Sequence, residues 1–277
     1  MTLNRSSWYY KTKPKGDKKS VRPLDPTLVN RLVSLKDYEL TLGYRKTTAY
    51  FMNTFNEVFN HKKVYRHMDS LKLLQPKHVR KPKVKKLSKV LWYCPLQSNL
   101  RWESDLTLVP THGGFSYLFT VIDVFDKEVI GSYFGLRCRC SEAIEALRQA
   151  VSSRFHNGKI PDNLILTLRL DRGCQFTAFD FINAARVLNI TIEFCDVQSP
   201  NQKPFIESFF ANFKREEVYR NSYQHFSHAF SAWKNYLHWY NHRRPHSALN
   251  FLSPVQFRAS LEVGNPLSFK SVLCPVL

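Results

Sequence analysis

Three acidic residues occupy local settings that suit metal-assisted chemistry. Asp105 opens an apolar run, Asp171 follows the apolar run 164–170, and Glu207 begins a helical pattern after a loop with two prolines. Carboxylates gathered at strand ends repel one another and need nearby cations to stay ionised together. Oxygen ligands of this kind suit Mg²⁺, and a pair of Mg²⁺ ions can activate an attacking oxygen and stabilise a leaving one in phosphoryl transfer.

The spacing of the last two acids is weak evidence by itself. Between Asp171 and Glu207 lie 35 residues, but other acidic pairs have the same separation: Asp69 and Asp105, Asp126 and Asp162, and Asp180 and Glu216. Only Asp171 and Glu207 join a strand end to a helix start across a helix-plus-strand insert. The local setting, not the spacing, therefore selects them.

Positive charge is concentrated in the first third of the chain. Residues 1–92 carry a net charge of +16, whereas residues 93–277 carry +3 of the total of +19. This imbalance favours a polyanion-binding arm joined to a globular domain, with nucleic acid as the expected polyanion. The alternative is a solubilising basic tail.

Neither a membrane span nor a zinc site is expected. No stretch approaches about 18 consecutive apolar residues, and residues 1–20 lack the apolar segment of a secretory signal. None of the six cysteines forms a C-x₂-C pair. We therefore expect a cytoplasmic protein with reduced thiols.

The N-terminal region has the pattern of a small helical DNA-binding element. One helix is expected over 44–53 and a second after Asn60, with Val64 and Met68 on its inner face. The basic side chains of the second helix lie on other faces, and they are candidate DNA contacts: Lys62, Lys63 and Arg66. A helix-turn-helix fits this pattern, and so does a small basic helical hairpin that reads no groove.

From residue 99 the pattern changes to a mixed α/β domain. Strands are expected over 102–109, 115–123, 129–135, 164–170 and 190–194, and helices from a cap at Ser141 and over 177–188, 205–219 and 226–240. This order predicts a mixed sheet with helices on its faces. If the fourth strand pairs with the first, Asp105 and Asp171 meet, and the helix at Glu207 can supply a third ligand.

Several stretches resemble a known family. Those around the acids read Trp102-Glu-Ser-Asp-Leu-Thr with Ile122-Asp123, Asp171-Arg-Gly-Cys-Gln-Phe, and Ile206-Glu-Ser-Phe-Phe followed by Phe213-Lys-Arg-Glu. They resemble the integrase catalytic core of the retroviral integrase superfamily, and more closely the second-frame (OrfB) transposases of the insertion-sequence-three family. Residues 42–68 and 240–254 are similar to that family's helix-turn-helix segment and C-terminal signature.

The resemblance implies an RNase H-like fold and a bacterial, nucleoid-associated DNA transposase that uses Mg²⁺, for which Mn²⁺ can substitute. It implies that Asp105, Asp171 and Glu207 are the catalytic metal ligands. The implied reaction is cleavage at the 3′ ends of an element followed by strand transfer. The implied partners are double-stranded DNA (terminal inverted repeats and target), further copies of the chain on DNA, and an OrfA protein or fusion. One departure is Cys174, where the family usually has Ser or Thr.

Four basic residues in the core are further candidate DNA contacts. Lys214 lies seven residues after Glu207, about 10 Å along one helix face. A basic residue at this offset contacts DNA in related integrases, and the alternative is a surface lysine that pairs with Glu217. The other three are Lys203, Arg243 and Arg244, of which the arginines could instead pack against the core.

These observations divide the chain into four expected regions: a basic helical region (1–74), a Pro/Lys linker (75–98), an RNase H-like catalytic core with a C-terminal helix (99–262) and a tail (263–277). Two other functions remain compatible with the sequence. One is an inactive helix-turn-helix DNA-binding protein, and the other is an RNase H-like nuclease that only hydrolyses.

Overall fold

A computed structural model describes residues 23–76, 95–196 and 202–262 of the chain. The chain divides into two compact units, residues 1–35 and residues 36–277. Most of the expected linker and the whole expected tail lie outside the described residues. Of the helices in the described part, none has the length and apolar content needed to cross a lipid bilayer.

The first unit contributes one described helix, α2 (Pro26–Val33). Asp25 caps it, because its side chain accepts a hydrogen bond from the Thr27 N–H at 3.0 Å. Pro26 at the first helical position has no N–H to leave unpaired, which suits a helix start.

The second unit begins with a 3₁₀ turn, η1 (Asp37–Thr41), and two helices, α3 (Tyr44–Phe55) and α4 (His61–Ser70). The N-cap predicted at Asn60 is confirmed: its side chain accepts from the Lys62 N–H at 2.9 Å. Val64 and Met68 are buried as predicted, and Lys62 is exposed. The two expected helices are therefore present.

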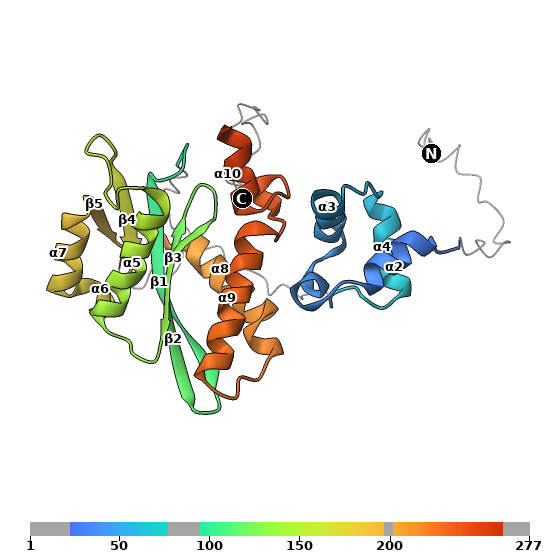
Figure 1. Ribbon diagram of the computed structural model, residues 1–277, viewed down its shortest axis with the longest axis horizontal. Helices are drawn as coiled ribbons and strands as arrows, with labels where there is room; N and C mark the ends of the chain where they lie inside the picture. The colour runs from blue at the N-terminus through green and yellow to red at the C-terminus, as the bar shows by residue number, and fades with distance from the viewer. Residues whose placement is uncertain (1–22, 77–94, 197–201, 263–277) are drawn as a thin grey trace, which may run out of the picture. The chain divides into compact units, whose positions relative to one another are not determined.

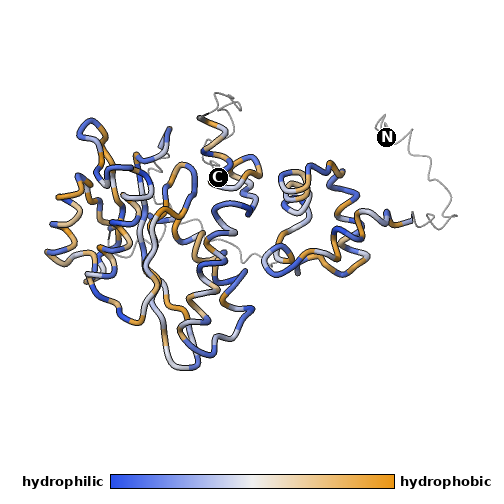
Figure 2. The backbone as a smooth tube through the Cα atoms, in the orientation of Figure 1, coloured by the Kyte–Doolittle hydropathy of each residue, from blue (hydrophilic) through white to orange (hydrophobic). Residues whose placement is uncertain are grey.

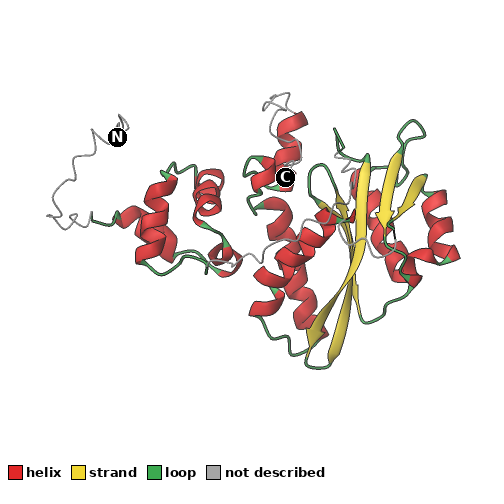
Figure 3. Ribbon diagram, turned by 180° about the vertical axis from the view of Figure 1, so that it is seen from behind, coloured by secondary structure: helices red, strands yellow, loops and turns green. Residues whose placement is uncertain are grey.

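A five-stranded mixed sheet forms the centre of the second unit, in the order β3-β2-β1-β4-β5. β1 (Arg101–Thr111), β2 (Gly114–Asp123) and β3 (Val129–Gly135) pair antiparallel. β4 (Leu166–Leu170) pairs parallel with β1, and β5 (Ile190–Phe194) pairs parallel with β4. The predicted mixed sheet and the predicted pairing of the first and fourth strands are confirmed (Figure 3).

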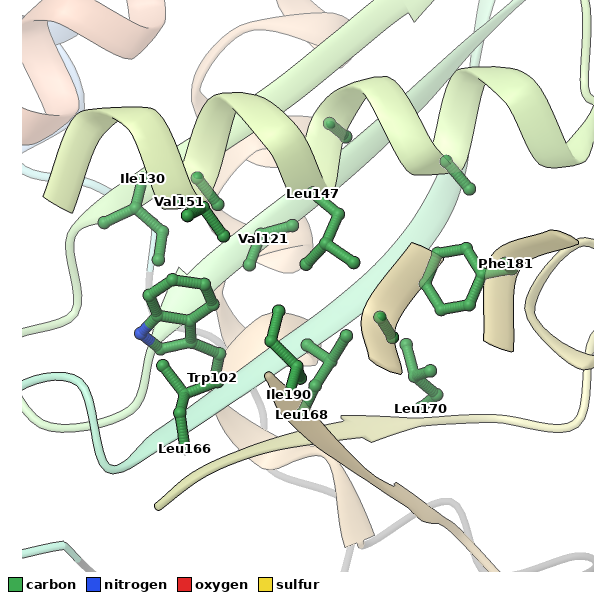
Figure 4. Close-up of a cluster of buried hydrophobic side chains, with 14 of the residues drawn as sticks. Trp102, Val121, Ile130, Leu147, Val151, Leu166, Leu168, Leu170, Phe181 and Ile190 are labelled. Carbon is green, nitrogen blue, oxygen red and sulfur yellow. The ribbon is translucent and has the colours of Figure 1, made fainter. Parts of the chain in front are cut away.

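One face of the sheet carries the main hydrophobic core. It is covered by α5 (Cys140–Arg154) and α7 (Phe179–Val187), with the short α6 (Cys174–Thr177) beside them. Figure 4 shows Trp102, Leu168 and Phe181 of this core beneath α5. Burying each such side chain contributes about 1.5–3 kcal/mol, so this face stabilises the strands that carry the polar site.

The other face is covered by α8 (Pro204–Glu216) and α9 (Phe226–His242), which Figure 1 shows across the sheet from α5 and α7. Aromatic rings join these two helices. The Phe209 ring lies 4.8 Å from that of Tyr240, and the Phe213 ring lies 5.1 Å from that of Trp233. Apolar and polar residues alternate along these helices (Figure 2), as expected for helices with one buried face. A 3₁₀ turn, η3 (Val218–Arg220), lies between α8 and α9, and the described chain ends with η4 (Ser247–Leu249) and α10 (Pro254–Glu262).

Several helix boundaries differ from the sequence prediction. Ser141 is not the cap of α5: the helix begins at Cys140, and the Arg139 N–H donates to the Glu142 carboxylate at 2.8 Å. The helix expected over 177–188 begins later, as α7 at Phe179, because Ala178 has an extended backbone that separates it from α6. The helix expected over 205–219 ends at Glu216 and gives way to a 3₁₀ turn.

Candidate active site

The alternation of side chains along β1 places Asp105 on the α8 face of the sheet. Trp102 points into the core on the opposite face, so Glu103 and Asp105 share the side that α8 covers. The Asp105 side chain is 20% exposed, and its Oδ1 accepts from the Leu106 N–H at 2.9 Å. β1 thus presents the Asp105 carboxylate on the face of the sheet that α8 covers.

Asp171 immediately follows β4, the parallel neighbour of β1. Glu103 pairs with Arg169 in that ladder, and the same register continued by two residues places Asp171 opposite Asp105. Asp171 Oδ1 accepts from the Gly173 N–H at 3.0 Å. A Cβ at residue 173 would lie 3.0 Å from that same oxygen, so a larger residue there would press against the Asp171 carboxylate.

A lysine ammonium joins the two carboxylates. Lys203 Nζ lies 3.1 Å from Asp105 Oδ1 and 3.3 Å from Asp171 Oδ2. Lys203 is the residue that precedes α8, and it is only 6% exposed. The sequence predicted that Lys203 contacts DNA, but in this structure its charge is directed at the acids.

Glu207 lies in the first turn of α8. A carboxylate that the sequence analysis missed fixes the start of this helix: Glu103 Oε2 accepts from the N–H groups of Phe205 and Ile206 at 3.1 and 2.9 Å. Glu103 lies two residues from Asp105 on the same face of β1. An acid two residues before a candidate ligand in a strand was the available signal, because both must point to the same side.

Burial dominates the electrostatics of these acids. It raises the pKa of Asp105, which the nearby Lys203 ammonium partly offsets, and the Asp171 carboxylate raises it further. Burial also raises the pKa of Glu207, and the Asp105 carboxylate adds to the effect. Burial raises the pKa of Glu103 to about 7, against the two backbone N–H bonds that favour its charged form. Asp105 and Glu207 are therefore stabilised in their charged forms by a nearby positive charge.

The donor set fits a hard divalent cation, because it offers only carboxylate oxygens and already holds one cation, the Lys203 ammonium. The three acids are not yet gathered as metal ligands. Within the part of the chain that the structure describes, no three His, Cys, Asp or Glu side chains form a group that could hold a metal ion. The Lys203 ammonium lies between the carboxylates of Asp105 and Asp171.

The remaining basic candidates have different surroundings. Lys214 is half-buried on α8, and Arg243 is exposed at the end of α9. Glu217, the alternative partner of Lys214, accepts hydrogen bonds from Tyr223 and Asn221 at 2.8 Å. On the second N-terminal helix, Lys63 and Arg66 are half-buried beside the exposed Lys62.

The prediction that Arg244 binds DNA is corrected by the structure. Arg244 is 1% exposed, and its guanidinium donates to both carboxylate oxygens of Glu216 at 2.6 and 2.9 Å. A buried arginine paired in this way cannot reach a phosphate without breaking that ion pair. Arg244 therefore packs against the core, the alternative role that its sequence position allowed.

Cys174 stands where a hydroxyl residue was expected. It is the first residue of α6, directly after the Asp171–Gly173 turn, and its side chain is exposed. With cysteine at this position, the Gly173 N–H still donates to Asp171 Oδ1.

Comparison with known proteins identifies relatives of the sheet-bearing part of the chain. Family models for the integrase core domain match residues 95–200 and residues 188–254. An uncharacterized protein of insertion element IS136 from Agrobacterium fabrum is 32% identical over 165 residues, which are 58% of this chain and 84% of that relative. The transposase for insertion sequence element IS904 of Lactococcus lactis is 27% identical over 160 residues, 57% of this chain and 61% of that protein.

One solved structure supports the fold. A chain of the simian T-cell lymphotropic virus intasome, determined by cryo-EM in complex with PP2A regulatory subunit B56 gamma, matches with a TM-score of 0.51 at 17% identity. The match covers 76% of this chain and 73% of that chain. Together with the strand order, it confirms the predicted RNase H-like fold.

Proposed function

Since the chain belongs to the integrase core family of polynucleotidyl transferases, we propose that it cleaves the 3′ ends of an insertion element and joins them to target DNA. Its relatives among insertion-sequence transposases support this proposal. The observation that carries this proposal is the pair Asp105 and Asp171 on neighbouring parallel strands. Their carboxylates share one cation, the Lys203 ammonium. Glu207 approaches on a helix that β1 itself anchors through Glu103.

Asp105, Asp171 and Glu207 are the residues that would hold Mg²⁺, or Mn²⁺ in its place. When bound, the metal would activate the attacking oxygen and stabilise the leaving oxygen of a phosphodiester. The chain orients the ligands beforehand: the Leu106 and Gly173 N–H groups each fix one carboxylate oxygen of Asp105 and Asp171. Fixed ligands lower the reorganisation needed during the reaction.

Both proposed steps exchange one P–O bond for another. In cleavage a water oxygen attacks the phosphorus and the 3′ oxygen of the element leaves; in joining that 3′-OH attacks a target phosphodiester and a target oxygen leaves. Each step forms one P–O bond and breaks one, so no external energy source is needed. One set of carboxylates is therefore sufficient for cleavage and for joining.

DNA is held, in this proposal, by basic residues outside the acidic cluster. Lys62, Lys63 and Arg66 on α4 would contact the terminal inverted repeat, and Lys214 and Arg243 would contact DNA near the acids. The net charge of +16 on residues 1–92 would add affinity that weakens with salt, because bound phosphates release their counterions. Assembly of several copies on DNA and an OrfA partner or fusion belong to the same proposal.

One experiment separates this proposal from its alternatives. Purified full-length protein is incubated with Mg²⁺ or Mn²⁺, a labelled duplex that carries the element's terminal repeat, and a target plasmid. We expect products in which the labelled end is joined to the plasmid, and none with Asp171→Asn. Cut but unjoined DNA would indicate a nuclease, and shifted but uncut DNA would indicate a binding protein.

A further inference from the structure

A buried lysine between two candidate metal ligands has an unusual position. Lys203 is 6% exposed, and its Nζ lies 3.1 Å from Asp105 Oδ1, 3.3 Å from Asp171 Oδ2 and 3.5 Å from the Ser104 carbonyl oxygen. Its charge also acts on Glu207. One ammonium thus offsets part of the repulsion among the three acids.

The backbone of Lys203 is held in place, so only its side chain can leave. Pro204 follows it as the first residue of α8 and restricts the local backbone. The next two N–H groups, of Phe205 and Ile206, are bonded to Glu103. The lysine side chain has four rotatable carbon–carbon links beyond this anchor, and it can swing while the helix stays docked.

The ammonium and a divalent cation need the same oxygens. Mg²⁺ binds carboxylate oxygen at about 2.1 Å and requires a nearly complete octahedral shell. The Lys203 ammonium, in contact with Asp105 Oδ1 and Asp171 Oδ2, would crowd and repel a Mg²⁺ ion bound to the same oxygens. Metal entry at these two acids therefore requires the Lys203 ammonium to move.

We propose that Lys203 is a positioning residue that serves as the internal counter-ion of the two aspartates in the absence of DNA. When DNA binds, the Lys203 ammonium moves to a DNA phosphate and leaves the aspartates to the metal. This movement couples metal binding to DNA binding. This inference rests on the proposed metal site. A lysine ammonium binds phosphate as a point charge, so a backbone phosphate beside the acids is a suitable second partner. Without DNA the site is occupied by the protein's own cation, and metal affinity is low.

The first test measures Mn²⁺ binding to the DNA-free, full-length protein by isothermal titration calorimetry. We expect Lys203→Met to bind Mn²⁺ at least tenfold more tightly than the wild type, because the competing charge is gone. Lys234→Met, which removes an exposed lysine from α9, is the matched control for net charge and should stay within twofold of the wild type. Lys203→Gln provides a second variant if Lys203→Met folds poorly, and circular dichroism checks both.

The second test adds a duplex with the terminal repeat and measures the same Mn²⁺ affinities. Coupling through Lys203 predicts that DNA raises the wild-type affinity at least tenfold more than it raises that of Lys203→Met. Equal affinities of wild type and Lys203→Met without DNA, or equal gains with DNA, overturn the inference.

The proposed metal site itself is checked in the same titrations with Asp171→Asn in the Lys203→Met background. Loss of Mn²⁺ binding in this double variant shows that the acids hold the metal, so that an unchanged Lys203→Met then refutes only the role of Lys203. Binding that does not depend on Asp171 would refute the metal site and the inference together.

Discussion

Replacing Glu103 with Gln should change how the stability of the protein depends on pH. Glu103 is 1% exposed and anchors α8 through a single oxygen, Oε2, which accepts both backbone N–H bonds. A glutamine side chain also has one carbonyl oxygen that can accept both bonds. The variant therefore keeps the helix anchor but removes the titrating group.

The expected magnitude follows from the raised pKa. Burial raises the pKa of Glu103 from 4.5 to about 7. Between these values the folded protein retains a proton that the unfolded chain has released, so this group's contribution to stability falls as pH rises through the window. A difference of this size corresponds to about 3 kcal/mol, at roughly 1.4 kcal/mol for each pH unit.

We therefore expect the free energy of unfolding of Glu103→Gln, relative to the wild type, to be about 3 kcal/mol more favourable at pH 8 than at pH 4.5. Urea denaturation of both proteins at the two pH values measures it. Other titrating groups cancel in the double difference because they are present in both proteins. An equal difference at the two pH values, or one that is less favourable to the variant at pH 8 than at pH 4.5, would refute the reasoning: the charged bonds to Phe205 and Ile206 would then outweigh the cost of burying the carboxylate.

Three further outcomes are expected. Asp171→Asn should abolish cleavage of a labelled terminal repeat while its affinity in a gel-shift assay stays within about threefold, and near-normal cleavage would remove Asp171 from the site. Lys214→Ala should lower the single-turnover cleavage rate at saturating enzyme more than it lowers DNA affinity, with partial recovery in Lys214→Arg, whereas an unchanged rate would make it an ordinary surface lysine. Arg244→Gln should destabilise the protein by about 3–5 kcal/mol because it leaves Glu216 buried and unpaired. Arg243→Gln, at the neighbouring position, should leave the melting temperature nearly unchanged and weaken DNA binding. Equal effects of the two variants on stability would contradict a structural role for Arg244 alone.

The sequence predicted the sheet well because its signals are local and periodic. β3 and β5 have the expected bounds, and the parallel pairing of β4 with β1 follows from the alternation of strands and helices. Helix boundaries were less predictable. The start of α5 depends on a bond from the Arg139 N–H to Glu142, and the break at Ala178 depends on backbone geometry that no residue type there requires.

Charged residues in the site were predicted only in part, because their roles depend on partners far away in the chain. The settings of Asp105 and Asp171 were visible in their own strands, and the structure brings the two around one ammonium. The anchoring role of Glu103 requires α8 to be packed against β1, about one hundred residues later in the chain. Arg244 was indistinguishable from Arg243 by sequence, although one is buried and the other exposed.

The anchor between Glu103 and the start of α8 has a consequence for how this chain can change in length. β1 carries Asp105 directly and positions Glu207 through Glu103, so one strand sets the relative placement of two acids. The connection that leads from β5 to α8 then does not need a fixed length to place the helix. A change of length in that connection ahead of Lys203 would leave the Glu103 anchor in place, whereas a one-residue insertion within β1 would turn the following side chains to the opposite face.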